Sequence, residues 1–169
     1  MTSPAYPPAL RDVDTYPITV AIVQSLLADP AVTGNKSVNG YEGVGTRIYP
    51  EANIDPDVSG QGQEFPYLVV TTAATTVPYD YTSAAIDALF DITVVDRAHT
   101  PTNLHGGTQN VVPVTKAAQA RILNNHLTVT GMTGVAVVPS TAPRGTATVN
   151  AGTVYRQRQF TVRVLALRQ

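Results

Sequence analysis

The chain has 169 residues, of which 43% are hydrophobic and only 14% are charged, and this length and apolar content suit one globular domain with its own core. It contains no cysteine, which excludes a disulfide framework, a thiolate metal site and a cysteine nucleophile. No apolar run approaches the roughly 18 residues of a helical membrane span.

Charge is divided unevenly along the chain. Residues 1–96 hold all twelve acids and three basic residues, which gives −9, whereas residues 97–169 hold no acid and eight basic residues, which gives +8. Two interpretations stay open. Either the halves interleave in space and neutralise each other, or the subunit has one acidic and one basic face. In the second case, identical subunits can associate head to tail and close into a ring.

The chain begins with a predicted extended arm, followed by a helix. Residues 1–15 are rich in proline and lack the basic and apolar regions of a signal peptide, so we expect synthesis in the cytoplasm of the cell. Apolar residues recur four positions apart from Ile18 to Leu26, which is typical of an amphipathic helix. We place this helix at residues 16–29 and treat residues 16–169 as one domain.

The other elements follow from apolar periodicity and turn residues. A thinner apolar stripe with a proline near its start predicts a second helix at residues 112–127. Alternating and β-branched stretches predict strands at 45–49, 66–74, 86–96, 132–139 and 153–167. Polar stretches rich in glycine and proline predict long loops at 33–45, 50–64, 97–111 and 140–152.

Two strands alternate clearly enough to assign their faces. One face is predicted to hold Phe90, Ile92, Val94, Phe160, Val162, Val164 and Ala166. The opposite face is predicted to hold Asp87, Asp91, Thr93, Gln157, Gln159, Thr161 and Arg163.

The order helix, strands, helix, strands is typical of an α+β fold. We expect a single, mainly antiparallel sheet of four to five strands with two helices packed on one face and long inter-strand loops. Long loops on one compact sheet indicate surfaces built for contact. The loop between the first two strands is acidic, and we expect it to reach a partner or a neighbouring subunit through Glu51, Asp55, Asp57 and Glu64.

Catalytic groups are sparse. Asp96, His99 and His105 follow one another near the end of a predicted strand and offer metal ligands, although polar loop residues are the simpler interpretation. The chain has no His-Glu-x-x-His zinc motif and no Gly-x-Ser-x-Gly nucleophile turn. We therefore expect no enzyme activity, no cofactor and no metal. A metal hydrolase built on these three residues is the alternative.

The arginines of the basic half are candidates for contacts. Arg156 and Arg158 share the face of Phe160, whereas Arg163 lies on the opposite face. Three roles stay open for them: contact with another subunit, a solvated surface, and binding to nucleic acid phosphates. The candidate interface residues beyond the acidic loop are Arg97, Arg144, Arg156, Arg158 and Arg163.

Six segments occur in an order that resembles bacteriophage tail terminator, or tail completion, proteins. They read IVQSLLADPAV, GTRIYP, FPYLVV, LFDITVVD, KAAQARILNNHL and YRQRQFTVRVLA. The resemblance covers residues 16–167, and it rests on the order and spacing of these short motifs.

The resemblance implies a small α+β subunit that closes into a ring, typically a hexamer, at the tail–neck junction of the virion. Such a ring caps the tail tube, stops its polymerisation and joins the tail to the neck, while DNA passes through its centre. The implied partners are other copies of the chain, the tail tube protein, the neck or connector protein and, in contractile tails, the sheath protein. The protein would be made in the cytoplasm of the host bacterium.

Two other functions stay open. Another phage neck component, such as a head-closure or connector protein, would also form a ring and would be isolated with DNA-filled heads. A ligand- or carbohydrate-binding module that uses the tyrosines and long loops would be a monomer.

Overall fold

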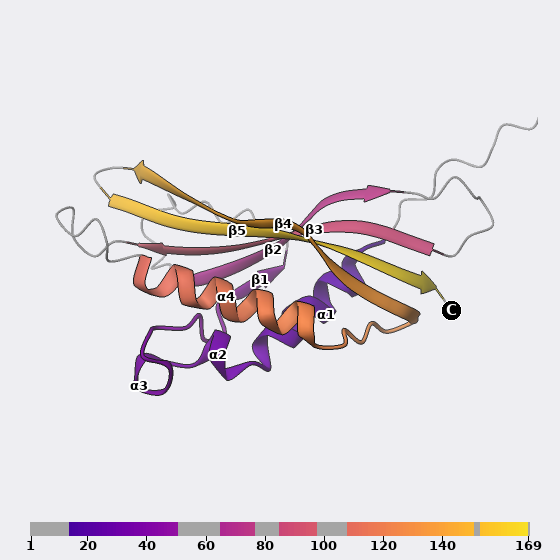
Figure 1. The fold of residues 1–169 in the computed structure, drawn as a ribbon, viewed down its shortest axis with the longest axis horizontal. Coiled ribbons are helices and arrows are strands. Elements are labelled where there is room, and N and C mark those ends of the chain that lie inside the picture. The colour runs from indigo at the N-terminus through magenta and orange to yellow at the C-terminus, as the bar shows by residue number, and fades with distance from the viewer. Residues whose placement is uncertain (1–13, 51–64, 77–84, 98–107, 151–152, 169) are drawn as a thin grey trace, which may run out of the picture.

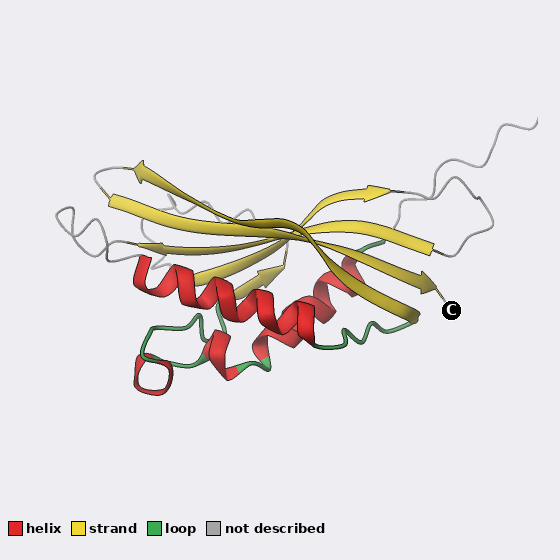
Figure 2. Cartoon of the chain, viewed as in Figure 1, coloured by secondary structure: helices red, strands yellow, loops and turns green. Residues whose placement is uncertain are grey.

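The chain folds into one five-stranded sheet with helices on one of its faces, as Figures 1 and 2 show. The computed structural model describes residues 14–50, 65–76, 85–97, 108–150 and 153–168. The helices in these residues are α1 (Tyr16–Leu27), α2 (Pro30–Thr33), α3 (Lys36–Asn39) and α4 (Thr108–Asn124). The strands are β1 (Ile48–Pro50), β2 (Tyr67–Thr76), β3 (Ala85–Arg97), β4 (Met132–Asn150) and β5 (Thr153–Arg168). The predicted α+β class is confirmed.

The strands lie in the order β1-β2-β3-β5-β4. Neighbours are antiparallel except β1 and β2, which are parallel. The central pair, β3 and β5, keeps one register without a break from Ala85 opposite Leu167 to Arg97 opposite Tyr155. The sheet is therefore mainly antiparallel, as predicted, and β4 is an edge strand along one whole side.

Helix α1 begins where the sequence predicts and ends two residues early. Its start is fixed by Asp14, whose Oδ1 accepts a hydrogen bond from the Tyr16 amide at 3.0 Å. It ends at Leu27 because Asp29 caps the next helix, where its Oδ1 accepts from the Ala31 amide at 2.9 Å. The predicted arm, residues 1–15, lies almost wholly outside the described residues.

The prediction of a single loop at residues 33–45 is wrong, because this segment contains the end of α2 and all of α3. Asn35 caps α3 by accepting a hydrogen bond from the Val38 amide at 3.3 Å. Gly40 then ends α3 with a φ of +76°, a left-handed conformation that glycine adopts without steric cost. A helix of four residues is too short to show an apolar periodicity in the sequence.

Strand β1 lies slightly later than the predicted range of 45–49. Gly45 still belongs to a turn, with a φ of +57°, and the Arg47 amide donates to the Val44 carbonyl at 3.0 Å. The strand therefore starts only at Ile48. Strands β2, β3 and β5 lie within two residues of their predicted bounds.

Helix α4 starts four residues before the predicted range of 112–127 and ends three residues before the end of that range. Pro113 therefore lies at the sixth position of the helix. Proline has no amide hydrogen, so the Gln109 carbonyl receives no helical hydrogen bond from this position. Gln109 is exposed, so water can donate to its carbonyl. The helix ends where the Asn125 side chain donates to the Arg121 carbonyl at 3.0 Å.

The largest correction concerns residues 140–152, which the sequence predicts to be a long loop. Strand β4 instead continues to Asn150, and its pairing with β5 shifts register at three places. Pro139 and Pro143 lie within it. Proline is tolerated because β4 is an edge strand, where one side of the backbone needs no partner in the sheet, and register shifts of this kind are common at sheet edges.

The core fills the space between the sheet and the helices. The predicted apolar face of β3 and β5 is confirmed. Each residue predicted to lie on it is at most 3% exposed, namely Phe90, Ile92, Val94, Phe160, Val162, Val164 and Ala166. From the helices, Ile18, Ile22 and Leu26 of α1 and Val114, Ala118 and Ile122 of α4 pack into the same cluster. The two long helices thus cover one face of the sheet, as predicted, and leave the other face open.

Candidate assembly surface

The open face of the sheet is the face that points away from α1 and α4 (Figure 1). Strand register places the predicted polar residues of β3 and β5 on this face, in agreement with the sequence. In the described part of the chain no helix covers it. We therefore consider the open face, its free edge at β4 and the nearby arginines together as the candidate assembly surface.

On the open face, Arg163 forms an ion pair with Asp87. Arg163 Nε donates to Asp87 Oδ1 at 2.8 Å, and a second guanidinium nitrogen donates to Oδ2. Hydrogen bonding from Arg163 lowers the pKa of Asp87 below its ordinary value, while burial opposes the shift. The guanidinium of Arg163 is thus engaged within its own subunit. The neighbouring Thr161 hydroxyl donates to Asp91 Oδ1 at 2.6 Å, which extends the polar network.

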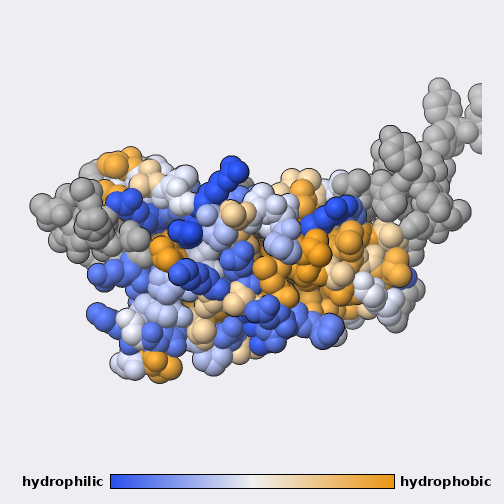
Figure 3. Space-filling model, viewed as in Figure 1, coloured by the Kyte–Doolittle hydropathy of each residue, from blue (hydrophilic) through white to orange (hydrophobic). Residues whose placement is uncertain are grey.

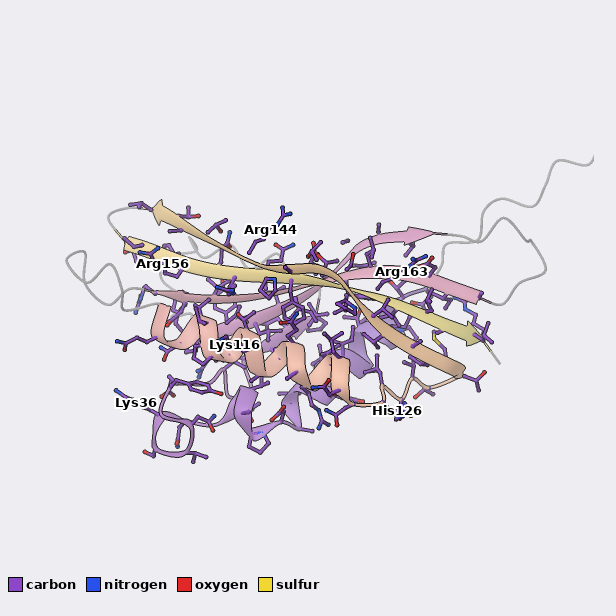
Figure 4. The ribbon with its side chains drawn as sticks, viewed as in Figure 1. Lys36, Lys116, His126, Arg144, Arg156 and Arg163 are labelled. Atoms are coloured by element: carbon purple, nitrogen blue, oxygen red, sulfur yellow. The ribbon has the colours of Figure 1, made fainter. Side chains whose placement is uncertain are left out.

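Arg144 lies on the open face, opposite Gln159 of β5 (Figure 4). It lines a cavity of about 280 Å³ together with Thr141, Thr146, Gln157, Gln159 and Thr161. The described lining residues offer hydroxyl, amide and guanidinium groups, and none of them is an acid. This cavity offers hydrogen-bond donors to a polar or anionic group from outside the subunit.

Arg156 and Arg158 lie on the helix side of β5, half-buried beside the first turns of α4. They line a second cavity of about 240 Å³, whose apolar wall includes Val111 and Val112. Thr146 and Gln157 contribute to both cavities, so the two hollows adjoin the same stretch of the hairpin. Strand register places both arginines on the face of Phe160, as the sequence predicts, between the buried Val154 and the core residue Phe160.

Arg97 ends β3 and lies over an aromatic group that the sequence did not indicate. Its guanidinium carbon is 5.2 Å from the centre of the Phe65 ring, within cation–π range. Phe65 also packs against Tyr67 and Tyr155, with ring centres 5.3 Å and 5.8 Å apart. Phe65 lies just before β2, Tyr67 begins β2 and Tyr155 lies on β5, so only the register of the sheet reveals the cluster.

Four of the five predicted arginines therefore gather at one end of the sheet. We call this the arginine end: Arg97, Arg144, Arg156 and Arg158. Arg156 and Arg158 lie on β5. Arg97 lies opposite Tyr155 of β5, and Arg144 lies opposite Gln159. The described acids at this end are engaged, since Asp96 is only 2% exposed and the Glu42 carboxylate accepts from the Lys36 amide at 3.4 Å.

Apolar surface also lies near the free edge of the sheet. Figure 3 shows hydrophobic residues gathered over the first half of β4 and the end of β5. The exposed side chains there include Val138, Leu165 and Leu167, which are 38–50% exposed. Contiguous exposed apolar residues on a soluble domain are typical of protein–protein contacts. The sequence contained a signal for two of them, because Leu165 and Leu167 lie on the polar side of the alternation in β5.

The remaining predicted residues are either buried or outside the part of the chain that the structure describes. Glu51, Asp55, Asp57, Glu64, His99 and His105 lie outside the described residues. Asp96 is buried, and its carboxylate accepts from Asn110 Nδ2 at 2.9 Å and from the Arg97 amide at 2.8 Å. In the described residues no three histidines or acids are grouped so that they could hold a metal ion. None of the described helices has both the length and the apolar character of a membrane span.

Comparison with known proteins identifies the fold. No protein-family model and no curated protein matches the chain. Several solved chains match it, among them a chain of the structure "Virion of native gene transfer agent (GTA) particle". The TM-score is 0.50 at 18% sequence identity, and the match covers 89% of this chain and 94% of that chain. The two chains share a fold over nearly their full lengths.

Proposed function

We propose that this chain is a structural component of a phage-like virion, and that it is a tail terminator. The observation that carries the proposal is the fold shared with a gene transfer agent virion chain over 94% of that chain. The order of short motifs in the sequence favours the terminator among virion components. The proposed role is assembly, without catalysis, metal or cofactor.

The surface of the subunit supports such a role. The open polar sheet face, the apolar surface near β4 and the arginine end all offer groups for contact with other subunits or proteins. A basic region on a chain whose acids lie in its other half suits head-to-tail association, which closes into a ring when the rotation between subunits permits. We propose a ring, of six subunits in the simplest case.

In this proposal the ring sits at the tail–neck junction of the virion. One side would bind the last layer of tail tube protein, and in a contractile tail the sheath as well. The other side would bind a neck or connector protein, and genomic DNA would pass through the centre without sequence-specific contacts. The subunit would be made in the host cytoplasm and incorporated there.

Polymerisation of the cognate tail tube protein tests this function. The purified chain is added to growing tubes, which are imaged by negative-stain electron microscopy, with an equal amount of serum albumin as the control. We expect a ring on one end of each tube and an end to growth from that end. Unchanged growth together with recovery of the chain on DNA-filled heads would assign it to head closure instead.

A further inference from the structure

The cavity beside Arg156 and Arg158 has the chemistry of a receptor for a carboxylate. It lies between the first turns of α4 and the part of the β4–β5 hairpin near its turn, with a volume of about 240 Å³. Two guanidinium groups contribute to its lining, and none of the lining residues that the structure describes is an acid. Guanidinium groups bind carboxylates through paired hydrogen bonds in a fixed geometry.

Arg158 provides the main argument. Its Nε is buried, yet no group of the described structure accepts a hydrogen bond from it. A buried donor without an acceptor is destabilising, and such groups are rare in folded proteins. Arg156 interacts within its own chain, and it lies opposite Asp96 in the register. The Nε of Arg156 is also buried without an acceptor, but Arg156 takes part in another interaction within the subunit, so we assign the incoming group to Arg158.

We propose that this cavity receives an acidic side chain from a second copy of the chain. The inference rests on the proposed ring, and it names the contact through which neighbouring subunits bind. The carboxylate of the incoming residue accepts from Arg158, and its aliphatic stem packs against the apolar wall formed by Val111, Val112 and Ala147.

Charge favours this occupant. The chain has a surplus of acids in residues 1–96, where the formal charge is −9, and Asp14 is exposed among the described ones. In Figure 1 helix α1 begins on the right of the view, whereas β4 ends and β5 begins on the left. A head-to-tail contact can bring such groups together.

The geometry disfavours the phosphates of DNA as the main ligand. Duplex binding relies on several exposed cations that follow the backbone, whereas Arg156 and Arg158 are half-buried in a small hollow with an apolar wall. One carboxylate side chain fits this volume and this mixture of apolar and cationic groups.

Arg158→Gln and Arg168→Gln form a matched pair of variants. Both positions lie on β5 with the same strand parity and both changes remove one charge, but Arg168 is exposed at the far end of the strand. The self-association constants of the wild type and both variants are measured by sedimentation equilibrium at about 0.05 M and about 0.5 M salt. Circular dichroism melts establish that each variant is folded.

We expect Arg158→Gln to weaken self-association by about tenfold or more, because it leaves a buried carboxylate without its charged partner. Arg168→Gln should change it by less than about twofold. High salt should weaken the self-association of the wild type and reduce the difference between its association constant and that of Arg158→Gln. Arg158→Lys keeps the charge but loses the paired donors, so its self-association constant should lie between those of the wild type and Arg158→Gln.

Equal association of wild type and Arg158→Gln would overturn the inference, and so would a wild type that stays monomeric at every concentration. A labelled DNA duplex provides the other arm, read by fluorescence anisotropy. If Arg158→Gln weakened only the binding of this duplex, the cavity would be a phosphate site and the inference would be wrong. The proposed function is judged separately by tube capping, so an Arg158→Gln protein that associates and caps normally would refute this contact alone.

Discussion

Asp87 on β3 and Arg163 on β5 are joined across the open face of the sheet, with Arg163 Nε 2.8 Å from Asp87 Oδ1. They are diagonal neighbours, since Asp87 lies opposite Leu165 and Arg163 lies opposite Leu89. The pair connects the acidic half of the sequence with the basic half inside one subunit. Here the two halves interleave and neutralise each other, whereas at the arginine end the described acids are buried or otherwise engaged.

This pair makes the stability of the fold depend on pH. The pKa of Asp87 is lowered by its hydrogen bond from Arg163, so the pair contributes stability above the pKa of the unfolded chain and loses it as the pH falls through the folded pKa. We expect Asp87→Asn to lower the melting temperature at pH 7 by a small amount. The difference from wild type should shrink as the pH falls below about 4.

Thermal melts followed by circular dichroism between about pH 7 and about pH 2 check this expectation. A difference between the two proteins that stayed constant across the range would show that the ion pair is not its cause.

The faces of β5 predict unequal costs for adjacent substitutions. Phe160 is 1% exposed and packs in the core, whereas Gln159 is exposed on the open face. Phe160→Ala should lower the free energy of unfolding by about 3–5 kcal/mol, because it removes buried apolar surface and leaves a cavity. Gln159→Ala should change it by less than about 0.5 kcal/mol. Urea unfolding measures both, and similar costs would contradict the strand register.

Asn110 connects helix α4 to two other parts of the chain. Its Nδ2 donates to Asp96 Oδ2 at 2.9 Å, and its Oδ1 accepts from the Glu42 amide at 3.0 Å. Asn110→Ala should destabilise the protein by about 1–3 kcal/mol, because the buried Asp96 carboxylate loses a donor. Gln109→Ala, at the exposed neighbouring position, is the control. The expectation fails if urea unfolding gives the two variants the same free energy.

The acidic loop predicted between the first two strands has its own test, which depends on the proposed function. Deleting residues 53–62 should leave a folded subunit, because shortening a connection changes loop-closure entropy only slightly. We expect tails of abnormal length, because the deleted segment would bind the tube, the neck or the next subunit. Electron microscopy of tails from a complemented deletion strain measures their length, and tails of normal length would refute this role.

The strong periodicities were sufficient to predict much of the fold. Ile18 to Leu26 predicted α1, and the alternation through Phe90 and Phe160 predicted β3, β5 and the face that each buries. These assignments succeed because one apolar face must be removed from water, and the period of that face is a local property of the sequence. The order of elements then indicated the α+β class and a sheet with one open face.

Only the tertiary structure decided what happens where local signals conflict. Pro143 and Gly145 are typical of a loop, yet they lie in β4 because β5 supplies hydrogen bonds on one side and an edge strand needs none on the other. The arginine end is likewise invisible along the chain. Arg97 comes from β3 and Arg144 from β4, and only the register of the sheet brings them beside Arg156 and Arg158 on β5. Sequence determined which residues must be buried; pairing between distant strands determined which remaining residues meet.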